Sequence, residues 1–178
     1  MIPILHPPLT RGRHGLCAVL ALLLVSGLAP AQAGDHVQSP STPAPPAYAA
    51  ECGACHLAYP PGLLPAASWQ GLMAGLPRHF GSDASLDEAT TRQLADWLQA
   101  NAATARRLRE PPPQQRITQA AWFQRKHREV EPAVWRDPSV RSAANCAACH
   151  PGAARGRFSE HELRWPAALD ARYRRDAD

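Results

Sequence analysis

Hydrophobic residues recur at helical spacing along several stretches of the chain. The clearest stretch, residues 85–106, opens with Ser85 and Glu88 in the order of a capping box. Its apolar residues near one face are Leu86, Leu94, Trp97 and Leu98. No alternation of apolar and polar residues reaches a useful length for a strand, so the sequence predicts a mainly α fold with little or no sheet.

Proline residues mark the limits of two further predicted helices. Residues 65–76 begin with Pro65, which favours the first turn, and Pro77 follows the last residue. Residues 117–130 are predicted to be helical from Thr118 as the cap, with Pro132 as the stop. We also expect a helix to lead into each of the stretches "ECGACH" and "NCAACH".

The N-terminal stretch has the three parts of an export signal. A short basic region is followed by the apolar run of residues 15–29 and by the small residues Ala31 and Ala33. The apolar run is shorter than the roughly 20 residues of a membrane-spanning helix, which argues against a retained anchor. We therefore predict a signal peptide at residues 1–33, cleaved before Gly34, and a periplasmic location.

Cleavage of the signal peptide changes the net charge and the composition of the chain. The formal net charge falls from +4 to +2, because two arginines and no acidic residue are removed. The basic character of the precursor is therefore no sign of nucleic-acid binding. The mature chain begins with a Pro- and Ser-rich stretch, which predicts a flexible lead-in at residues 34–47. Alanine supplies much of the apolar content, so a core made of polypeptide alone would be thin.

Two copies of the motif C-x-x-C-H contain all the cysteines of the mature chain, because cleavage removes Cys17. The motif residues are Cys52, Cys55 and His56 in the first copy, and Cys146, Cys149 and His150 in the second. A structural zinc site would give the two histidines no required role, and the pairs lie far apart in sequence. A redox disulfide needs one pair beside a strand and a helix, and no strand is predicted.

Covalent attachment of haem c explains every position of the motif. Two thiols on one turn bond to the two vinyl groups of the porphyrin, and the histidine that follows reaches the iron. Export agrees with this interpretation, since such haems are attached outside the cytoplasm. Two large apolar cofactors would also fill the thin core. We therefore predict two covalently bound haem c groups, with His56 and His150 as axial ligands.

The second axial ligand of each iron must come from the remaining residues of the mature chain. The candidates are His36, His79, His127, His161 and Met73. His79 follows His56 by 23 residues, and His127 precedes His150 by the same number. Aromatic residues flank both, namely Phe80 beside His79, and Trp122 and Phe123 before His127. We therefore predict that His79 and His127 are axial ligands and not surface histidines. His161 and Met73 are reserve candidates.

These predictions divide the chain into five parts. The signal peptide and lead-in are followed by a first haem lobe at residues 48–110 and a second haem lobe at residues 111–168. The stretch "RLREPPPQQRI" connects the lobes, and residues 169–178 are expected to be a solvated tail.

From Tyr48 to Trp165 the sequence resembles the small periplasmic dihaem cytochromes c, the group whose best-known member pairs with the sphaeroides haem protein. The resemblance rests on "ECGACHLAYPPGLLPAASWQGLMAGLPRHFG", "DASLD", "RITQAAWFQRKHREV" and "SAANCAACHPGAARGRFSE". It implies two covalently held haems, each with two histidine ligands. It also implies that His79 and His127 are the second axial ligands; by proximity we pair them with His56 and His150. The C-terminal end departs from the family's usual ending.

The resemblance implies a low-spin electron carrier that passes electrons between a membrane cytochrome b and a soluble monohaem cytochrome. We expect no catalytic residues, no nucleic-acid partner and a monomer. Two rival functions require an iron with a labile axial position: a dihaem peroxidase-like enzyme, and a haem-based gas or redox sensor. Such peroxidases are generally much longer, and the chain has no room for a sensor's output domain.

Overall fold

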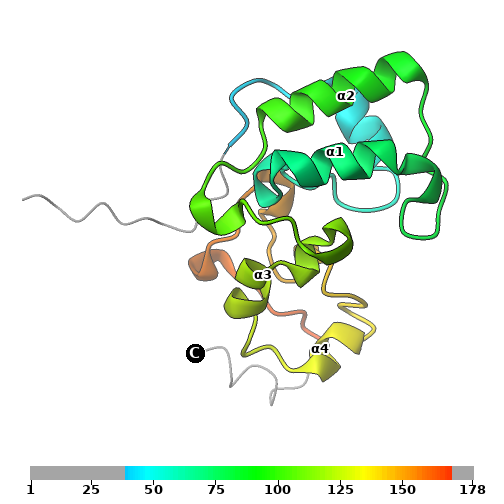
Figure 1. Ribbon diagram of the computed structural model, residues 1–178. Helices are drawn as coiled ribbons and strands as arrows, with labels where there is room; N and C mark the ends of the chain where they lie inside the picture. The colour runs from blue at the N-terminus through cyan, green and yellow to red at the C-terminus, as the bar shows by residue number, and fades with distance from the viewer. Residues whose placement is uncertain (1–38, 170–178) are drawn as a thin grey trace, which may run out of the picture. The chain divides into compact units, whose positions relative to one another are not determined.

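The structure is a computed structural model that describes residues 39–169, all within the unit formed by residues 33–178. The predicted signal peptide, His36 and residues 170–178 of the predicted tail lie outside the described residues. Four α-helices follow one another along the described chain (Figure 1): α1 (Ala66–Ala74), α2 (Glu88–Ala100), α3 (Ala121–Lys126) and α4 (Pro132–Arg136).

Short helical turns connect these helices. They are η1 (Tyr48–Cys52), η2 (Pro61–Leu63), η3 (Leu76–Arg78), η4 (Arg106–Leu108), η5 (Pro113–Gln115), η6 (Ile117–Gln119), η7 (Cys146–Ala148), η8 (Ala153–Arg155) and η9 (Glu160–Glu162). Between residues 39 and 169 there is no strand, and the one β-bridge pairs His79 with Ser82. The predicted helical fold class is therefore confirmed. None of the helices in this part of the chain has the length and hydropathy needed to cross a membrane.

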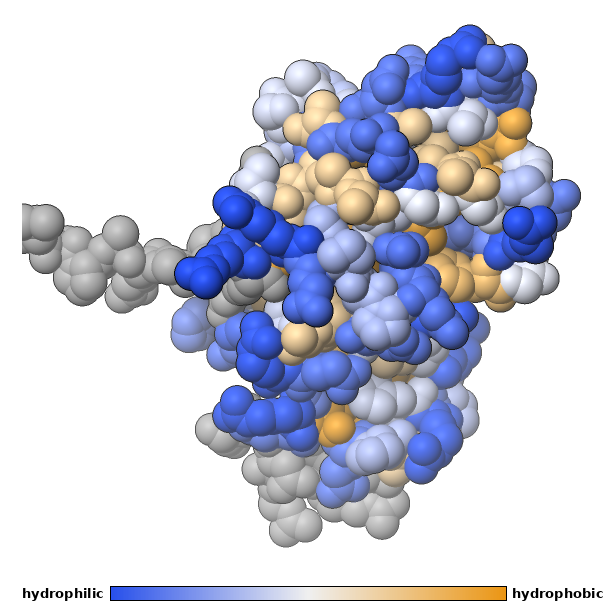
Figure 2. Space-filling model, in the orientation of Figure 1, coloured by the Kyte–Doolittle hydropathy of each residue, from blue (hydrophilic) through white to orange (hydrophobic). Residues whose placement is uncertain are grey.

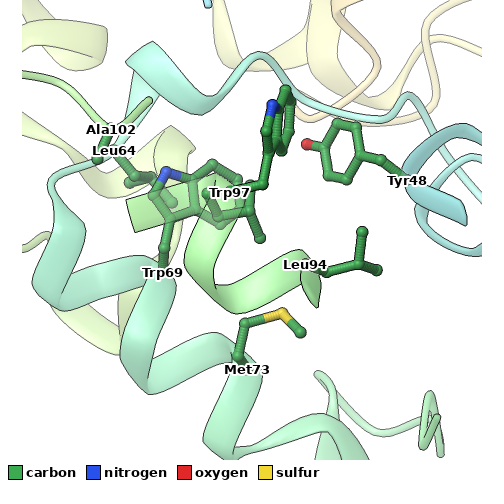
Figure 3. Packing of buried hydrophobic residues seen from close by; sticks show 8 residues of the cluster. Tyr48, Leu64, Trp69, Met73, Leu94, Trp97 and Ala102 are labelled. Atoms are coloured by element: carbon green, nitrogen blue, oxygen red, sulfur yellow. The ribbon is translucent and has the colours of Figure 1, made fainter. Parts of the chain in front are cut away.

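Helices α1 and α2 lie side by side and enclose a hydrophobic cluster, which we call the first cluster (Figures 1 and 3). Its buried members are Tyr48, Leu64, Trp69, Met73, Leu94, Trp97, Leu98 and Ala102. The indole Nε1 of Trp69 donates a hydrogen bond to the carbonyl oxygen of Pro61 at 2.8 Å, so this buried polar atom is satisfied. The first cluster therefore supplies a conventional core for the part of the chain that contains α1 and α2.

The predicted limits of α2 are wrong at both ends: the expected cap, Ser85, lies two residues before the observed one, and the helix ends at Ala100 and not at residue 106. The N-cap is Asp87, whose carboxylate accepts a hydrogen bond from the backbone N–H of Thr90 at 2.9 Å. Ser85 instead donates its backbone N–H to Asp83. An Asp is at least as good a cap as a Ser, and the capping-box pattern alone does not choose between them.

Asn101, at the end of α2, is buried and fixes the chain that precedes the first cluster. Its Oδ1 accepts hydrogen bonds from the backbone N–H and the hydroxyl of Ser41, at 2.7 and 2.9 Å. Its Nδ2 donates to the carbonyl oxygen of Trp97 at 2.8 Å. Part of the stretch predicted to be a flexible lead-in is thus tied to α2 by a satisfied buried amide.

The part of the chain after residue 120 is more irregular than predicted. The helix expected from Thr118 begins only at Ala121, because the buried Ala120 is extended, with φ −64° and ψ 138°. A helix leading into the second motif is absent in the described residues; Arg141 has φ 68°, a left-handed conformation that ends a helical run. Only the turn η7 covers the second motif.

A second hydrophobic cluster is much smaller than the first. Its buried members are Val134 from α4, Val140 and Leu169, with Val130, Ala148, Trp135 and Trp165 packed partly buried around them. On the face drawn in Figure 2, hydrophobic residues gather mostly over the part that contains α1 and α2. The polypeptide around the second motif therefore has few apolar contacts of its own.

Candidate haem sites

The first motif begins at the last residue of η1 and continues through a turn. Gly53 caps η1 and donates its backbone N–H to the carbonyl oxygen of Ala49 at 3.1 Å. A Cβ atom at position 53 would lie 2.3 Å from that oxygen, so the turn requires glycine there. The close turn places Cys52 at the end of η1, while Cys55 and His56 follow on the exposed surface.

His56 and His79 face each other, although 23 residues separate them in the sequence. Their ring centroids are 6.1 Å apart and their planes differ by 26°. Nδ1 of His56 lies 2.7 Å from the carbonyl oxygen of Leu57, which can only accept a hydrogen bond, so Nδ1 carries the proton. The unprotonated Nε2 of His56 is then free to bind a metal ion.

His127 and His150 form a second pair of the same size. Their ring centroids are 6.3 Å apart, and their planes differ by 82°. Nδ1 of His127 donates to the carbonyl oxygen of Phe123 at 2.9 Å, one turn earlier in α3. Nδ1 of His150 is buried and has no partner among the described residues. The backbone N–H of His150 donates to the carbonyl oxygen of Cys146 at 2.8 Å. This hydrogen bond fixes the backbone of His150 relative to the first cysteine of its motif.

The separation within each pair fits the two axial positions of one iron ion. An imidazole nitrogen binds a first-row metal ion at about 2 Å and lies roughly 1 Å from its own ring centre, so two axial imidazoles have ring centres about 6 Å apart. Both histidine pairs have this spacing. The pairing expected from sequence proximity therefore agrees with the geometry, and iron binding by these four histidines stays a prediction.

Burial favours the neutral form of three of the four histidines, the form that binds iron. It is the main factor that lowers the pKa of His79, His127 and His150. The other histidine of the pair lowers the pKa of His79 and His150 further, since two imidazolium ions at this distance would repel each other.

The four motif thiols are free, and no disulfide joins them. Burial raises the pKa of Cys52 and Cys149, and it raises the pKa of Cys146 to about 11. Burial thus disfavours the thiolate, the form that exchanges, at Cys52, Cys146 and Cys149. Within residues 39–169 no group of three or more His, Cys, Asp or Glu side chains forms a metal site, so the zinc alternative has no support in the geometry.

The reserve ligands lie elsewhere. Met73 is buried in the first cluster, where Figure 3 shows its side chain beside that of Leu94. His161 is exposed in η9, and its backbone N–H donates to the hydroxyl of Ser159. Neither residue makes a ring or hydrogen-bond contact with a motif histidine among the contacts of this structure.

Aromatic residues surround both histidine pairs, and most of them were not identified from the sequence. Tyr59 stacks on His56 with a centroid distance of 5.0 Å, and Phe158 meets His150 edge-on at 5.5 Å. Trp135 contacts His127 at 5.8 Å. Phe80, Trp122 and Phe123 were expected beside their histidines; Phe80 and Phe123 contact them, whereas the ring of Trp122 meets that of Phe123 at 5.9 Å. Tyr59 and Phe158 come from irregular segments and Trp135 from α4, and sequence spacing does not indicate that these rings meet the histidines.

Arg116 extends over the ring of the exposed Phe80, with its guanidinium carbon 4.2 Å from the ring centroid. Phe80 in turn meets His79 edge-on at 4.8 Å, and the charge of Arg116 contributes to the lowered pKa of His79. This cation–π contact joins the segment before α3 to the loop that carries His79.

The fold and the site define a small helical protein with two C-x-x-C-H motifs, each beside a pair of facing histidines. Residues 48–158 match the family of dihaem cytochromes c. This chain therefore belongs to the dihaem cytochrome c family, a family of electron-transfer proteins that contain two haem groups. No curated protein matches the sequence.

Solved structures agree with this assignment. The crystal structure of DHC from Rhodobacter sphaeroides is 50% identical, covering 66% of this chain and 99% of that chain, with a TM-score of 0.57. The dihaem cytochrome c of Shewanella baltica is 38% identical, covering 71% of this chain and 96% of that chain, with a TM-score of 0.62. The chain thus spans nearly the full length of both relatives.

Proposed function

We propose that this protein is an exported, periplasmic electron carrier in which each of two covalently attached haems is bound by two histidines. The observation that carries the proposal is the spacing of the two histidine pairs, 6.1 and 6.3 Å, each next to its own C-x-x-C-H motif. A haem iron that alternates between the ferrous and ferric states supplies one-electron transfer, and the polypeptide supplies its ligands and surroundings.

Cys52 and Cys55 would hold one haem, and Cys146 and Cys149 the other, each through two thioether bonds. Once bonded, the thiols no longer need to be shielded from exchange. His56 and His79 would fill both axial positions of the first iron, and His127 and His150 those of the second. With both positions filled by imidazole, neither iron offers a site for peroxide or a gas.

The histidine ligands also determine the range of reduction potentials. An imidazole does not favour ferrous iron as the thioether of a methionine does, so both potentials are expected to be modest or low. Met73, the only methionine of the mature chain, lies in the first cluster and supports this proposal. Hydrogen bonds from Nδ1 of His56 and His127 to backbone carbonyl oxygens make these imidazoles more basic, which also favours the ferric state.

For the partners we propose a membrane cytochrome b on one side and a soluble monohaem cytochrome on the other. This proposal rests on the resemblance to the small periplasmic dihaem cytochromes c. A chain with a mature formal charge near +2 has no strong electrostatic preference for nucleic acid, which fits redox proteins as partners.

The test uses the mature protein with both haems attached. Optical and low-temperature EPR spectra are recorded for the oxidised and reduced protein, with and without carbon monoxide. We expect two low-spin ferric signals, no absorption band of a thioether-bound ferric haem, and no spectral shift with carbon monoxide. A high-spin signal or a carbon monoxide complex in the wild-type protein would overturn bis-histidine ligation and favour a peroxidase or a gas sensor.

A further inference from the structure

Tyr59 contacts both haem-attachment segments, although it belongs to neither motif. Its ring stacks on the imidazole of His56, with centroids 5.0 Å apart and planes 28° apart. Its hydroxyl donates a hydrogen bond to the carbonyl oxygen of Ala144 at 2.7 Å. Ala144 is 85 residues further along the chain and only two residues before Cys146.

Through Tyr59, the path from His56 to Cys146 contains few residues. From the ring of His56, the connection runs through the Tyr59 phenol and one hydrogen bond to the Ala144 peptide, and from there through Asn145 to Cys146. Cys146 itself points its sulfur toward the same carbonyl oxygen, at 3.7 Å. When Cys146 is bonded to haem it has no thiol hydrogen to donate, and Tyr59 remains the donor to this oxygen.

Neighbouring contacts hold Tyr59 in place. Its own carbonyl oxygen accepts a hydrogen bond from the hydroxyl of the buried Tyr48. The buried Pro60 follows directly and restricts the backbone of Tyr59. On its other side, the Pro60 ring is 3.8 Å from the position that a Cβ atom of Gly156 would occupy, so it lies close to the chain after the second motif. The phenol is thus presented to Ala144 from a constrained backbone.

A second contact, between Arg116 and Phe80, also joins the two predicted lobes, but it lies elsewhere. The guanidinium of Arg116 lies over Phe80, whose ring meets His79 edge-on. Tyr59 therefore differs from Arg116 because it joins an axial histidine of one site to the attachment segment of the other.

We propose that Tyr59 is a positioning residue that fixes the separation of the two haem sites and thereby sets the rate of electron transfer between them. The inference rests on the proposed function, since it requires a haem at each motif. The transfer moves one electron from a ferrous to a ferric iron, and Tyr59 gains or loses neither an electron nor a proton. Electron tunnelling weakens steeply with distance, so a small loosening of this contact slows the transfer.

The test compares three variants of the full protein with both haems attached. Tyr59→Phe keeps the ring against His56 and removes only the hydrogen bond to Ala144. Tyr59→Leu removes the stacking as well. Thr91→Val is the matched control, because it removes a hydroxyl-to-carbonyl hydrogen bond that lies within the first turn of α2 and does not involve Tyr59. Rapid reduction of one haem followed by optical detection gives the inter-haem rate, and a redox titration gives the two potentials.

We expect Tyr59→Phe to slow inter-haem transfer several-fold while the low-spin EPR signals of both irons persist. Tyr59→Leu is expected to slow it at least as much and also to change the EPR signal of the first haem, because the plane of His56 is no longer held. Thr91→Val is expected to keep the wild-type rate.

Three results would contradict the positioning role or the function on which it rests. An inter-haem rate in Tyr59→Phe equal to that of wild type overturns the positioning role and leaves the proposed function intact. An equal loss of rate in Thr91→Val also overturns the positioning role, since the effect would then follow from general loosening. A high-spin iron in the wild-type protein would instead overturn the proposed function itself. Thermal unfolding of each variant shows that the rates are compared between folded proteins.

Discussion

The ring of Phe123 stacks on the imidazole of His127, with centroids 4.0 Å apart and planes 20° apart, and the Phe123 carbonyl oxygen accepts the Nδ1 hydrogen of the same imidazole at 2.9 Å. One residue thus fixes both the plane and the tautomer of a predicted axial ligand. It does so from the preceding turn of α3, where side chains four residues apart are neighbours. The plane so fixed is nearly perpendicular to that of His150.

The two histidine pairs should therefore give different EPR signals. Near-parallel imidazole planes, as in the pair His56 and His79, give a rhombic low-spin ferric signal. Near-perpendicular planes, as in the pair His127 and His150, give a strongly anisotropic signal with a larger maximum g value. Low-temperature EPR of the oxidised protein checks this, and two identical rhombic signals would contradict it. Phe123→Leu is expected to change only the second signal.

Removal of each second axial histidine should open one iron and leave the other intact. His79→Ala is expected to give a carbon monoxide complex at the first haem, and His127→Ala at the second, each with loss of one low-spin signal. Optical titration with carbon monoxide measures the stoichiometry. His161→Ala is the control, because His161 is exposed and makes no contact with a motif histidine; carbon monoxide binding by that variant would reassign the ligands.

Gly53 and Ala147 occupy the same place in the two motifs, but only the first is sterically required to be glycine. In Gly53→Ala the new Cβ atom would lie 2.3 Å from the carbonyl oxygen of Ala49, so the turn must shift. We expect destabilisation by about 1–3 kcal/mol, the usual cost of overpacking, and a lower occupancy of the first motif. Haem content by pyridine haemochrome and thermal unfolding measure the two effects. Ala147→Gly should change haem content little, and an equal loss in both variants would refute the steric explanation.

The N-cap of α2 should make stability depend on pH. Hydrogen bonds from Thr90 lower the pKa of Asp87, so the folded state favours the ionised carboxylate. The stabilisation is therefore present above the unfolded-state pKa of about 3.9 and is lost as the pH falls through the lower folded-state value. Asp87→Asn still caps the helix and does not titrate. Between neutral pH and a pH below the folded-state pKa of Asp87, the thermal midpoint of the wild type is expected to fall more than that of Asp87→Asn. Parallel plots of thermal midpoint against pH for the two proteins would show that the cap does not contribute to the pH dependence.

Leu94, on the face of α2 toward α1, has no exposed surface and belongs to the first cluster. Leu94→Ala leaves a cavity there, and such substitutions cost about 2–5 kcal/mol. We expect a lower thermal midpoint with unchanged EPR signals, because Leu94 packs within the first cluster. Leu72→Ala, at a partly buried position of α1 beside the same cluster, serves as a milder control. A change in the EPR signals of Leu94→Ala would show that the cluster supports the haem sites directly.

The sequence was sufficient for the elements with strong local signals. Helices α1 and α2 follow from apolar spacing and proline positions, and the motif residues follow from cysteine spacing. The cap at Asp87 was missed because Ser85 offers a competing pattern. The irregular stretches of the second part were missed because Ala120 is extended and Arg141 is left-handed, and neither residue type indicates such a conformation.

The candidate site shows the same division. The four histidines were selected by the motifs, by sequence spacing and by flanking aromatic residues; the structure places them in the two pairs expected from proximity, and iron binding stays a prediction. The orientation of each ring could not be predicted, because it depends on a carbonyl oxygen and an aromatic ring brought in by folding. The contact of Tyr59 with Ala144 shows this most clearly. The acceptor is the backbone carbonyl oxygen of Ala144, so the residue type does not indicate the hydrogen bond.

The unequal size of the two hydrophobic clusters has a consequence for the degradation of the protein in the cell. Eight buried residues hold the first cluster together, but only Val134, Val140 and Leu169 form the second. If the second site takes up a haem as proposed, a molecule without it has few apolar contacts to keep the chain after α3 folded, and we expect that stretch to be open to proteolysis. Degradation would then remove the molecules that carry only one of the two cofactors.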